Sequence, residues 1–165
     1  MEIRDSIIGD EEKLVKLFSV LETETQFMLM EPDESKLTIE KQAQLIKEFS
    51  QSNSRVLFVA SENNEIVGFL GGTGGYANRE RHTIKIAMGI LASYWGKDIG
   101  VQLLQALFTW AKMNHFHRIE LTVMEENLRA KALYSKVGFE IEGVKRKSLK
   151  VSGKYTNELL MSKLI

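Results

Sequence analysis

Residues 127–139 read NLRAKALYSKVGF, a stretch in which we predict a helix over residues 128–137. Tyr134 lies seven positions after Asn127, which is about two helical turns, so both side chains fall on one face of the helix. A strand-like run precedes the helix at residues 118–124, and an alternating apolar tail follows from Phe139. Strand and helix patterns alternate along the chain in this way, which predicts a mixed α/β domain.

Residues 94–104 read YWGKDIGVQLL and form a second informative stretch. They join a hydrophobic, central strand predicted at residues 83–91 to an amphipathic helix predicted at residues 100–114. Free backbone N–H groups and the helix dipole at such a junction attract an anion, and successive loop amides can surround a diphosphate without a basic side chain. Gly96 and Gly100 permit a close approach of the backbone. Many α/β domains carry a similar loop and bind no phosphate, so this stretch alone leaves both interpretations open.

Together the two stretches resemble the GCN5-related N-acetyltransferases, the GNAT family. Members of that family show Gln or Arg, two residues, Gly, one residue and then Gly or Ala after the fourth strand, followed later by Asn-x-x-Ala-x-x-Leu-Tyr-x-Lys-x-Gly-Phe. Residues 127–139 match the later pattern almost position by position, and the ending from Glu142 to Met161 is also similar. The resemblance implies the GNAT fold, an α/β (α+β) arrangement with a splayed, mostly antiparallel central sheet flanked by helices. It covers nearly the whole chain, so we expect a single N-acetyltransferase domain over residues 1–165.

The resemblance further implies acetyl-CoA as co-substrate. In such enzymes the pantetheine arm lies between the fourth and fifth strands and bonds to free backbone groups, which here belong to Met88, Gly89 and Ile90. The diphosphate would lie on the backbone amides of Gly96, Lys97, Asp98, Ile99, Gly100 and Val101. Asn127 would bind the cofactor arm from the other side, and Tyr134 would be the general acid that protonates the leaving thiolate.

The implied reaction is direct attack of a primary amine on the acetyl thioester. The broad group of ribosomal-protein and small-molecule acetyltransferases is most similar, so the acceptor is a small molecule or a protein N-terminus. A lysine-like amine with a pKa of about 10.4 must lose a proton before it can attack. Relatives that acetylate ribosomal protein N-termini commonly have a Glu base at the position of Thr122, and that base is absent. Other residues could act as the base, but their positions in the sequence do not favour one over another. They are Glu22, Glu24, Glu31, Glu80, Glu120 and His82.

Two positions depart from the family pattern. Trp95 stands where Gln or Arg is usual, and Asp98 replaces the first glycine of the diphosphate loop. A carboxylate at this position lies beside a negative ligand and should weaken cofactor binding modestly. If Asp98 instead points outward or caps the next helix, the diphosphate-binding amides of residues 96–101, which we call the backbone cradle, would stay intact. The rival function is a noncatalytic acyl-CoA-binding regulatory module that keeps the fold without turnover.

The composition excludes several classes of function. Lys and Arg total 22 against 22 Asp and Glu, so no net charge draws the chain toward nucleic acid or a membrane. The chain has no cysteine and its three histidines are scattered, so we expect no metal site. The first residues lack the basic segment followed by an apolar segment that is typical of a signal peptide. No apolar run reaches the ~20 residues of a membrane span, so we expect a cytoplasmic protein. Exposed strand edges at the C-terminal hairpin could pair two copies, which makes a homodimer the favoured but open oligomeric state.

The remaining elements are predicted from their periodicity. A strand at residues 2–7 precedes a helix that Asp10 can cap, and Thr38 can cap a second helix. Residues 23–36 have no clean period and should form a loop or broken helix, whose apolar residues 27–30 line an acceptor pocket or belong to the core. Strands at residues 55–60 and 66–70 should form a hairpin, as should the tail around Gly153. The glycine cluster at residues 71–75 predicts a flexible crossing.

Overall fold

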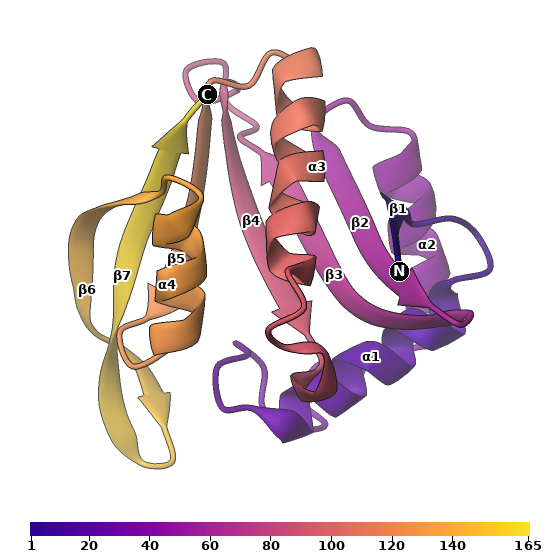
Figure 1. Cartoon of the computed structure of the whole chain (residues 1–165), viewed down its shortest axis with the longest axis horizontal. Helices are drawn as coiled ribbons and strands as arrows, with labels where there is room; N and C mark the ends of the chain where they lie inside the picture. The colour runs from indigo at the N-terminus through magenta and orange to yellow at the C-terminus, as the bar shows by residue number, and fades with distance from the viewer.

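The computed structural model describes residues 1–165, and its strands form one seven-stranded sheet in the order β1-β2-β3-β4-β5-β7-β6 (Figure 1). All neighbouring strands are antiparallel except β4 and β5, which are parallel. The strands are β1 (Glu2–Asp5), β2 (Arg55–Glu62), β3 (Glu65–Gly74), β4 (Thr83–Ile90), β5 (Arg118–Met124), β6 (Glu140–Val151) and β7 (Lys154–Leu164). The helices are α1 (Glu11–Glu24), α2 (Ile39–Ser50), the short 3-10 helix η1 (Ala92–Tyr94), α3 (Ile99–Met113) and α4 (Leu128–Lys136).

Two hydrophobic cores lie on the two faces of the sheet. The side chains of β2 alternate between them: Val56 and Phe58 pack in the core of α3, whereas Leu57 and Val59 pack in the core of α1 and α2. Both faces of this strand are buried, which is why its sequence is a continuous apolar run. Figure 1 shows α3 in front of the part of the sheet made by β1 to β4, and α4 in front of β5, whereas α1 and α2 pack against β3 and β2 from the opposite face. None of these helices is long and apolar enough to cross a lipid bilayer.

Strands β4 and β5 run side by side only at their first residues. Thr83, Ile84 and Lys85 pair with residues 118–120, and beyond that point the two strands diverge (Figure 1). On its other edge β4 stays paired with β3 as far as Ile90. One edge of β4 therefore has no strand partner from Ile86 onward, and a gap opens in the middle of the sheet. The splayed, mostly antiparallel sheet that the family resemblance predicted is confirmed.

Local signals in the sequence explain several element ends. Asn63 and Asn64 adopt left-handed φ values of 51° and 66°, which asparagine tolerates, and they close the predicted β2–β3 hairpin. Thr38 caps α2 as predicted, because its side chain accepts a hydrogen bond from Lys41 N at 3.2 Å. The prediction for Asp10 is wrong in detail. This residue occupies the N-cap of α1, but its carboxylate accepts hydrogen bonds from Arg4 Nη1 at 2.7 Å and Ile7 N at 2.9 Å instead of from the helix.

The glycines after residue 70 do not form the flexible crossing that we predicted. Gly71 and Gly72 lie inside β3 and pair with both β2 and β4. A Cβ atom on Gly72 would lie 2.7 Å from Ile84 Cδ1, and one on Gly74 would lie 2.9 Å from the Phe116 ring. These glycines allow neighbouring side chains to cover the strand closely, so their role is packing.

The tail forms the predicted hairpin of β6 and β7. Its turn is made by Ser152 and Gly153, with φ values of 49° and 80°. The register shifts between Lys145 and Leu149, where Asn157 Oδ1 accepts a hydrogen bond from Lys147 N at 2.8 Å. The resulting bulge bends the edge strand β6, while Lys145 remains paired with Glu158 of β7.

Candidate active site

Two cavities, each of about 260 Å³, adjoin the gap between β4 and β5. The first, which we call the α4-side cavity, is bordered by α4 and by the loop between β4 and α3, including Trp95 and Arg129. The second, the β7-side cavity, is bordered by β5 and β7, including Thr122 and Glu158. Residues that line both cavities are Phe27, Met28, Met88, Asn127, Ala130 and Tyr134. The two cavities therefore meet at the gap and share a wall that contains Tyr134.

Tyr134 is a buried titratable side chain at this meeting point. Only 7% of its surface is exposed, and its ring packs against Phe139 with 5.6 Å between the ring centroids. Burial raises the pKa of Tyr134 to about 12, because apolar surroundings disfavour the charged phenolate. The phenol therefore stays protonated at neutral pH and can donate a hydrogen bond to a group in the gap.

The free edge of β4 offers backbone groups to the gap. Leu91 N donates to Val67 O at 3.0 Å, and backbone groups alternate in direction along a strand. The polar groups of Gly89 therefore face β3, whereas those of Met88 and Ile90 face the gap. Ile90 O accepts a hydrogen bond from the indole Nε1 of Trp95 at 2.8 Å. Met88 N, Met88 O and Ile90 N are left without a strand partner.

The prediction of free backbone groups at Gly89 is wrong, because they face β3, and Gly89 contributes space instead. It lines the α4-side cavity, and a Cβ atom at this position would lie 2.7 Å from Leu21 Cδ1 and 2.8 Å from Phe69 Cε1. Any larger residue would have to displace these side chains of α1 and β3. The absence of a side chain at Gly89 thus keeps the end of α1 close to the gap.

The loop from Gly96 to Val101 presents consecutive backbone N–H groups that have no acceptor within the protein. The next amide, Gln102 N, donates to Asp98 O at 3.1 Å and so begins the hydrogen bonding of α3. Two left-handed residues shape the loop, Gly96 with a φ of 77° and Asp98 with a φ of 55°. Unpaired amides at the start of a long helix can hold an anion such as a diphosphate.

Asp98 points away from these amides. Its side chain is 72% exposed, does not cap α3, and lies with Oδ1 3.5 Å from Lys136 Nζ. This outward orientation is one of the two that the sequence left open as compatible with an intact cradle. The left-handed φ gives a physical reason for glycine in the family pattern, since glycine adopts such a φ without steric cost and aspartate does so more readily than most residues.

Helix α4 approaches the loop at two points across the α4-side cavity. The guanidinium carbon of Arg129 lies 3.6 Å from the centroid of the Trp95 ring, which is the geometry of a cation–π contact. Gly100 permits the second contact, because a Cβ atom there would lie 2.6 Å from Leu133 Cδ2. The two walls of the cavity are therefore held together at its edges.

Asn127 begins α4 and lines both cavities together with Tyr134, as their helical spacing predicted. Its Oδ1 accepts a hydrogen bond from Ala130 N at 3.1 Å, so the side chain caps the helix. This capping holds the amide group in a fixed place beside the gap. The Asn127 amide nitrogen donates to no other protein group and remains available as a donor.

The structure adds a carboxylate that the sequence pattern did not single out. Glu158 of β7 is 8% exposed and is the one charged side chain that lines the β7-side cavity. Burial alone would raise its pKa, but the pKa is lowered because the Lys145 ammonium and the hydroxyls of Ser148 and Thr122 stabilise the anion. In the sequence Glu158 is one polar residue of an alternating tail. Only the pairing of β7 with β5 brings it near Thr122.

The carboxylates and the histidine considered as bases from the sequence lie outside both cavities. Glu24 Oε2 accepts a hydrogen bond from Ala92 N at 2.9 Å, and Glu120 pairs with Arg118 at 3.1 Å. Glu22 and Glu31 line a neighbouring cavity under the loop between α1 and α2. None of the set lines the α4-side or the β7-side cavity: Glu22, Glu24, Glu31, Glu80, Glu120 and His82. Of the apolar residues 27–30, Phe27, Met28 and Leu29 do line the β7-side cavity.

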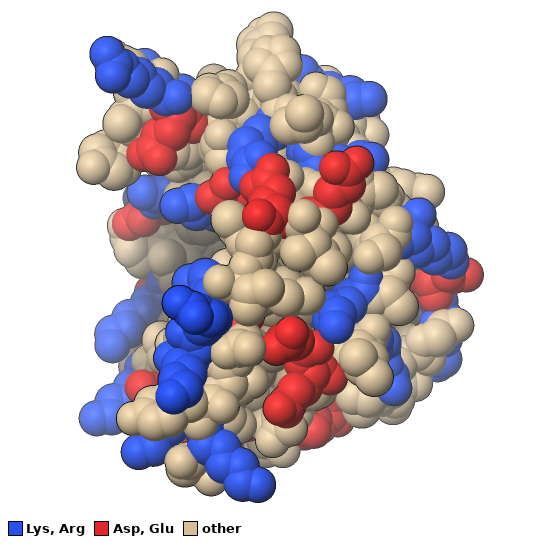
Figure 2. All heavy atoms as spheres, turned by 90° about the vertical axis from the view of Figure 1, so that its left-hand side faces the viewer, with Lys and Arg blue, Asp and Glu red and all other residues tan.

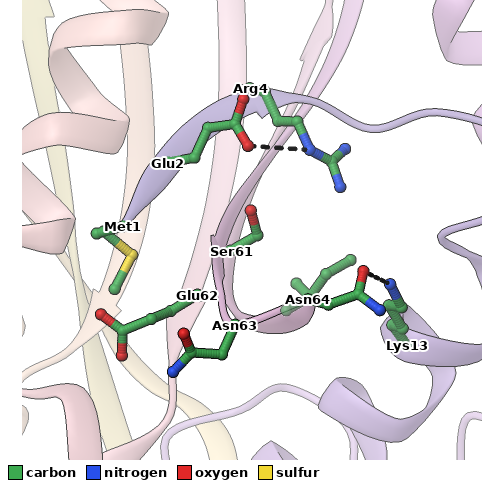
Figure 3. A pocket seen from close by; sticks show the side chains of 9 residues that line it. Met1, Glu2, Arg4, Lys13, Ser61, Glu62, Asn63 and Asn64 are labelled. Carbon is green, nitrogen blue, oxygen red and sulfur yellow. Dashed lines mark hydrogen bonds and ion pairs between the residues drawn. The ribbon is translucent and has the colours of Figure 1, made fainter.

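A larger depression, of about 590 Å³, lies beside β1 and the β2–β3 turn (Figure 3). Four of its polar side chains are paired with one another. Arg4 Nε lies 3.9 Å from Glu2 Oε2, and Lys13 Nζ donates to Asn64 Oδ1 at 2.7 Å. Of the residues that line it, only Met1 and Ile66 are apolar, so it lacks the apolar lining of a small-molecule site. Volume alone therefore does not identify the functional site.

Basic side chains gather on the β6 edge rather than around the gap. Figure 2 views the molecule from this edge and shows Lys and Arg side chains crowded toward the lower part, where Figure 1 places the β6–β7 hairpin. The exposed basic residues of β6 are Lys145, Arg146, Lys147 and Lys150. Acidic side chains lie among basic ones over the rest of this face (Figure 2), as on a solvated strand.

The sequence and the fold of this chain are similar to those of known acetyltransferases. A sequence profile of the acetyltransferase (GNAT) family matches residues 17–139. The crystal structure of a GNAT-family acetyltransferase from Streptococcus pneumoniae has a TM-score of 0.95 and 30% identity, over 99% of this chain and 98% of that chain. The L-amino acid N-acetyltransferase AaaT of Escherichia coli is 30% identical over 64% of this chain and 66% of its own length. The uncharacterized N-acetyltransferase YobR of Bacillus subtilis is 37% identical over 44% of this chain and 26% of its own length.

The chain therefore belongs to the acetyltransferase (GNAT) family, as the two sequence stretches predicted. Membership of this family places the protein in the class of acetyl-CoA-dependent acyltransferases, with acetyl-CoA as co-substrate. The family, the fold and the enzyme class predicted from the sequence are thus confirmed.

Proposed function

We propose that this protein transfers an acetyl group from acetyl-CoA to a primary amine of a small molecule or a protein N-terminus by direct attack. The observation that carries the proposal is the place of Tyr134 in the common wall of two cavities on either side of the gap. A proton donor at this point can serve a thioester that enters from one cavity and an amine that enters from the other.

In this proposal the α4-side cavity holds the co-substrate. The free backbone groups of Met88 and Ile90 would bind the pantetheine arm as a neighbouring strand would. The amides of residues 96–101 would hold the diphosphate at the start of α3, and the free amide nitrogen of Asn127 would donate to the arm from the opposite wall. Bound acetyl-CoA supplies the activated acetyl thioester at the gap.

Tyr134 is the proposed general acid. As the amine nitrogen bonds to the acetyl carbon and the C–S bond breaks, the phenol protonates the departing sulfur. The Tyr134 pKa of about 12 is above that of an ordinary thiol, about 8.5, so complete transfer requires Tyr134 to regain a proton at once from the attacking nitrogen. The reaction is then balanced in protons, because the neutral amine loses one proton and the sulfur of CoA gains one to become a thiol.

Release of free CoA by the purified protein tests the proposal. Acetyl-CoA would be offered with spermidine, lysine, an aminoglycoside and a set of short peptides, and we expect acetylation of at least one amine. Tyr134→Phe should lower kcat by about 10²-fold or more, the usual contribution of a general acid, with little change in the KM for acetyl-CoA. Binding of acetyl-CoA without transfer to any amine would instead favour the noncatalytic regulatory module.

A further inference from the structure

Glu158 is the single charged side chain in a cavity whose lining is otherwise mostly apolar. We propose that the Glu158 carboxylate binds the ammonium group of the acceptor, and that the acceptor is a primary amine carried on an apolar carbon group. This inference rests on the proposed function for the use of the cavity by an acceptor. It concerns ligand binding, however, and can be tested without turnover.

One close hydrogen bond from the protein reaches the Glu158 carboxylate, from Lys145 Nζ to Oε2 at 2.9 Å. The hydroxyls of Ser148 and Thr122 also stabilise the anion but carry no positive charge. The Lys145 side chain is 52% exposed and the Glu158 side chain 10%, so the cation lies nearer the surface than the anion. A partly compensated carboxylate beside an apolar space favours the binding of a second cation there.

Glu158 also lies close to the proposed reaction point. In the β5–β7 ladder it is paired with Met124, one step along the same face of the sheet from Thr122, and Tyr134 lines the same cavity. The hydroxyl of Ser148 is buried and turned toward the protein side of the carboxylate, whose pKa it helps to lower. The cavity side of Glu158 is therefore the side on which a ligand cation can approach.

The cavity lining defines the class of ligand. An ammonium would neutralise Glu158, while its carbon group would contact apolar residues such as Phe27, Phe69 and Leu149. A carboxylate or phosphate next to the amine would be repelled by Glu158. A carboxylate that is anionic at neutral pH is a weak base toward an alkylammonium, so we assign Glu158 to binding. The bound ammonium must lose one proton to water before it attacks the thioester as the neutral amine.

Calorimetric titration of the CoA-saturated protein with 2-phenylethylamine tests the inference. Glu158→Gln preserves the shape of the side chain and should weaken amine binding by about tenfold or more, which corresponds to ~1.4 kcal/mol. Lys145→Gln frees the carboxylate from its competitor and should tighten amine binding. If the ion pair only stabilised the β6–β7 hairpin, the two variants would change amine binding in the same direction.

The neutral analogue 2-phenylethanol supplies the ligand control and should bind at least about tenfold more weakly than the amine. The inference is overturned if the wild type fails to bind the amine, if it binds both compounds equally, or if Glu158→Gln binds the amine as the wild type does. Glu158-dependent amine binding without acetylation of any amine would support this inference and overturn the proposed function. Acetylation with an unchanged KM for the amine in Glu158→Gln would support the proposed function and overturn this inference.

Discussion

Asp98 has two opposing effects on the backbone cradle, the run of unpaired amides at residues 96–101. Its left-handed φ of 55° shapes the loop that exposes the unpaired amides, whereas its carboxylate adds negative charge to the same loop. The nearby Lys136 and the exposure of the side chain to solvent both weaken the field of that charge. The backbone conformation is thus the useful contribution of this residue, and the charge is a modest disadvantage.

Asp98→Gly should therefore lower the KM for acetyl-CoA. Glycine retains the left-handed conformation, and removal of a charge from a helix terminus changes binding by ~0.3–1 kcal/mol, or about two- to fivefold. Steady-state kinetics at low salt and at about 1 M salt, where the Debye length is ~3 Å, measures the effect, which should be lost at high salt. An unchanged KM at low salt would show that the Asp98 charge does not reach the ligand.

Helix α4 borders the α4-side cavity, and its contact with the first turn of α3 fixes its position. Helix α3 follows the β4 loop and α4 follows β5, so they lie on opposite sides of the gap (Figure 1). Their approach depends on Gly100, where a Cβ atom would lie 2.6 Å from Leu133 Cδ2. The same first turn of α3 carries unpaired amides, so the helix spacing and the position of the cradle are coupled.

Gly100→Val should raise the KM for acetyl-CoA by roughly five- to hundredfold, because overpacking of a close contact costs ~1–3 kcal/mol. The added methyl groups would push the start of α3 away from α4. The double variant Gly100→Val with Leu133→Ala removes the clash and should recover much of the affinity. Kinetics and thermal unfolding of both variants give the answer, and a double variant as impaired as Gly100→Val would rule out the spacing argument.

The whole molecule consists of two half-sheets joined by a short parallel ladder. Only three residue pairs connect β4 to β5, and the core of α3 spans both halves with residues such as Phe58 and Met161. A ligand in the gap would contact backbone of β4 on one side and α4 on the other. Its binding should therefore stabilise the two halves together.

We expect CoA to raise the Tm of the protein. A ligand present at about 100 times its Kd contributes ~2.7 kcal/mol, and each kcal/mol shifts the Tm of a domain of this size by about 2–4 °C, so the rise should be roughly 5–10 °C. Scanning calorimetry measures it, with pantetheine, which lacks the diphosphate together with the adenine nucleotide, at the same concentration as the control. Equal shifts for the two compounds would contradict the role of the residue 96–101 amides.

The local elements of this protein follow from its sequence. The strand predicted at residues 118–124 has the predicted bounds, and the helix predicted at residues 128–137 is observed as Leu128–Lys136. The run of free amides at residues 96–101, where α3 begins, was also predicted. These features depend on periodicity, capping and backbone hydrogen bonds between near neighbours in the chain, which a sequence displays directly.

Other features were decided only by the tertiary structure, because they depend on residues far apart in the chain. Gly72 serves packing because Ile84 of the next strand covers it. Asp10 binds Arg4 rather than its own helix. Glu158 becomes a cavity carboxylate because β7 pairs with β5 and so carries it to the gap. Strand register and the splay of β4 from β5 are set by contacts across the sheet, and no local pattern contains them.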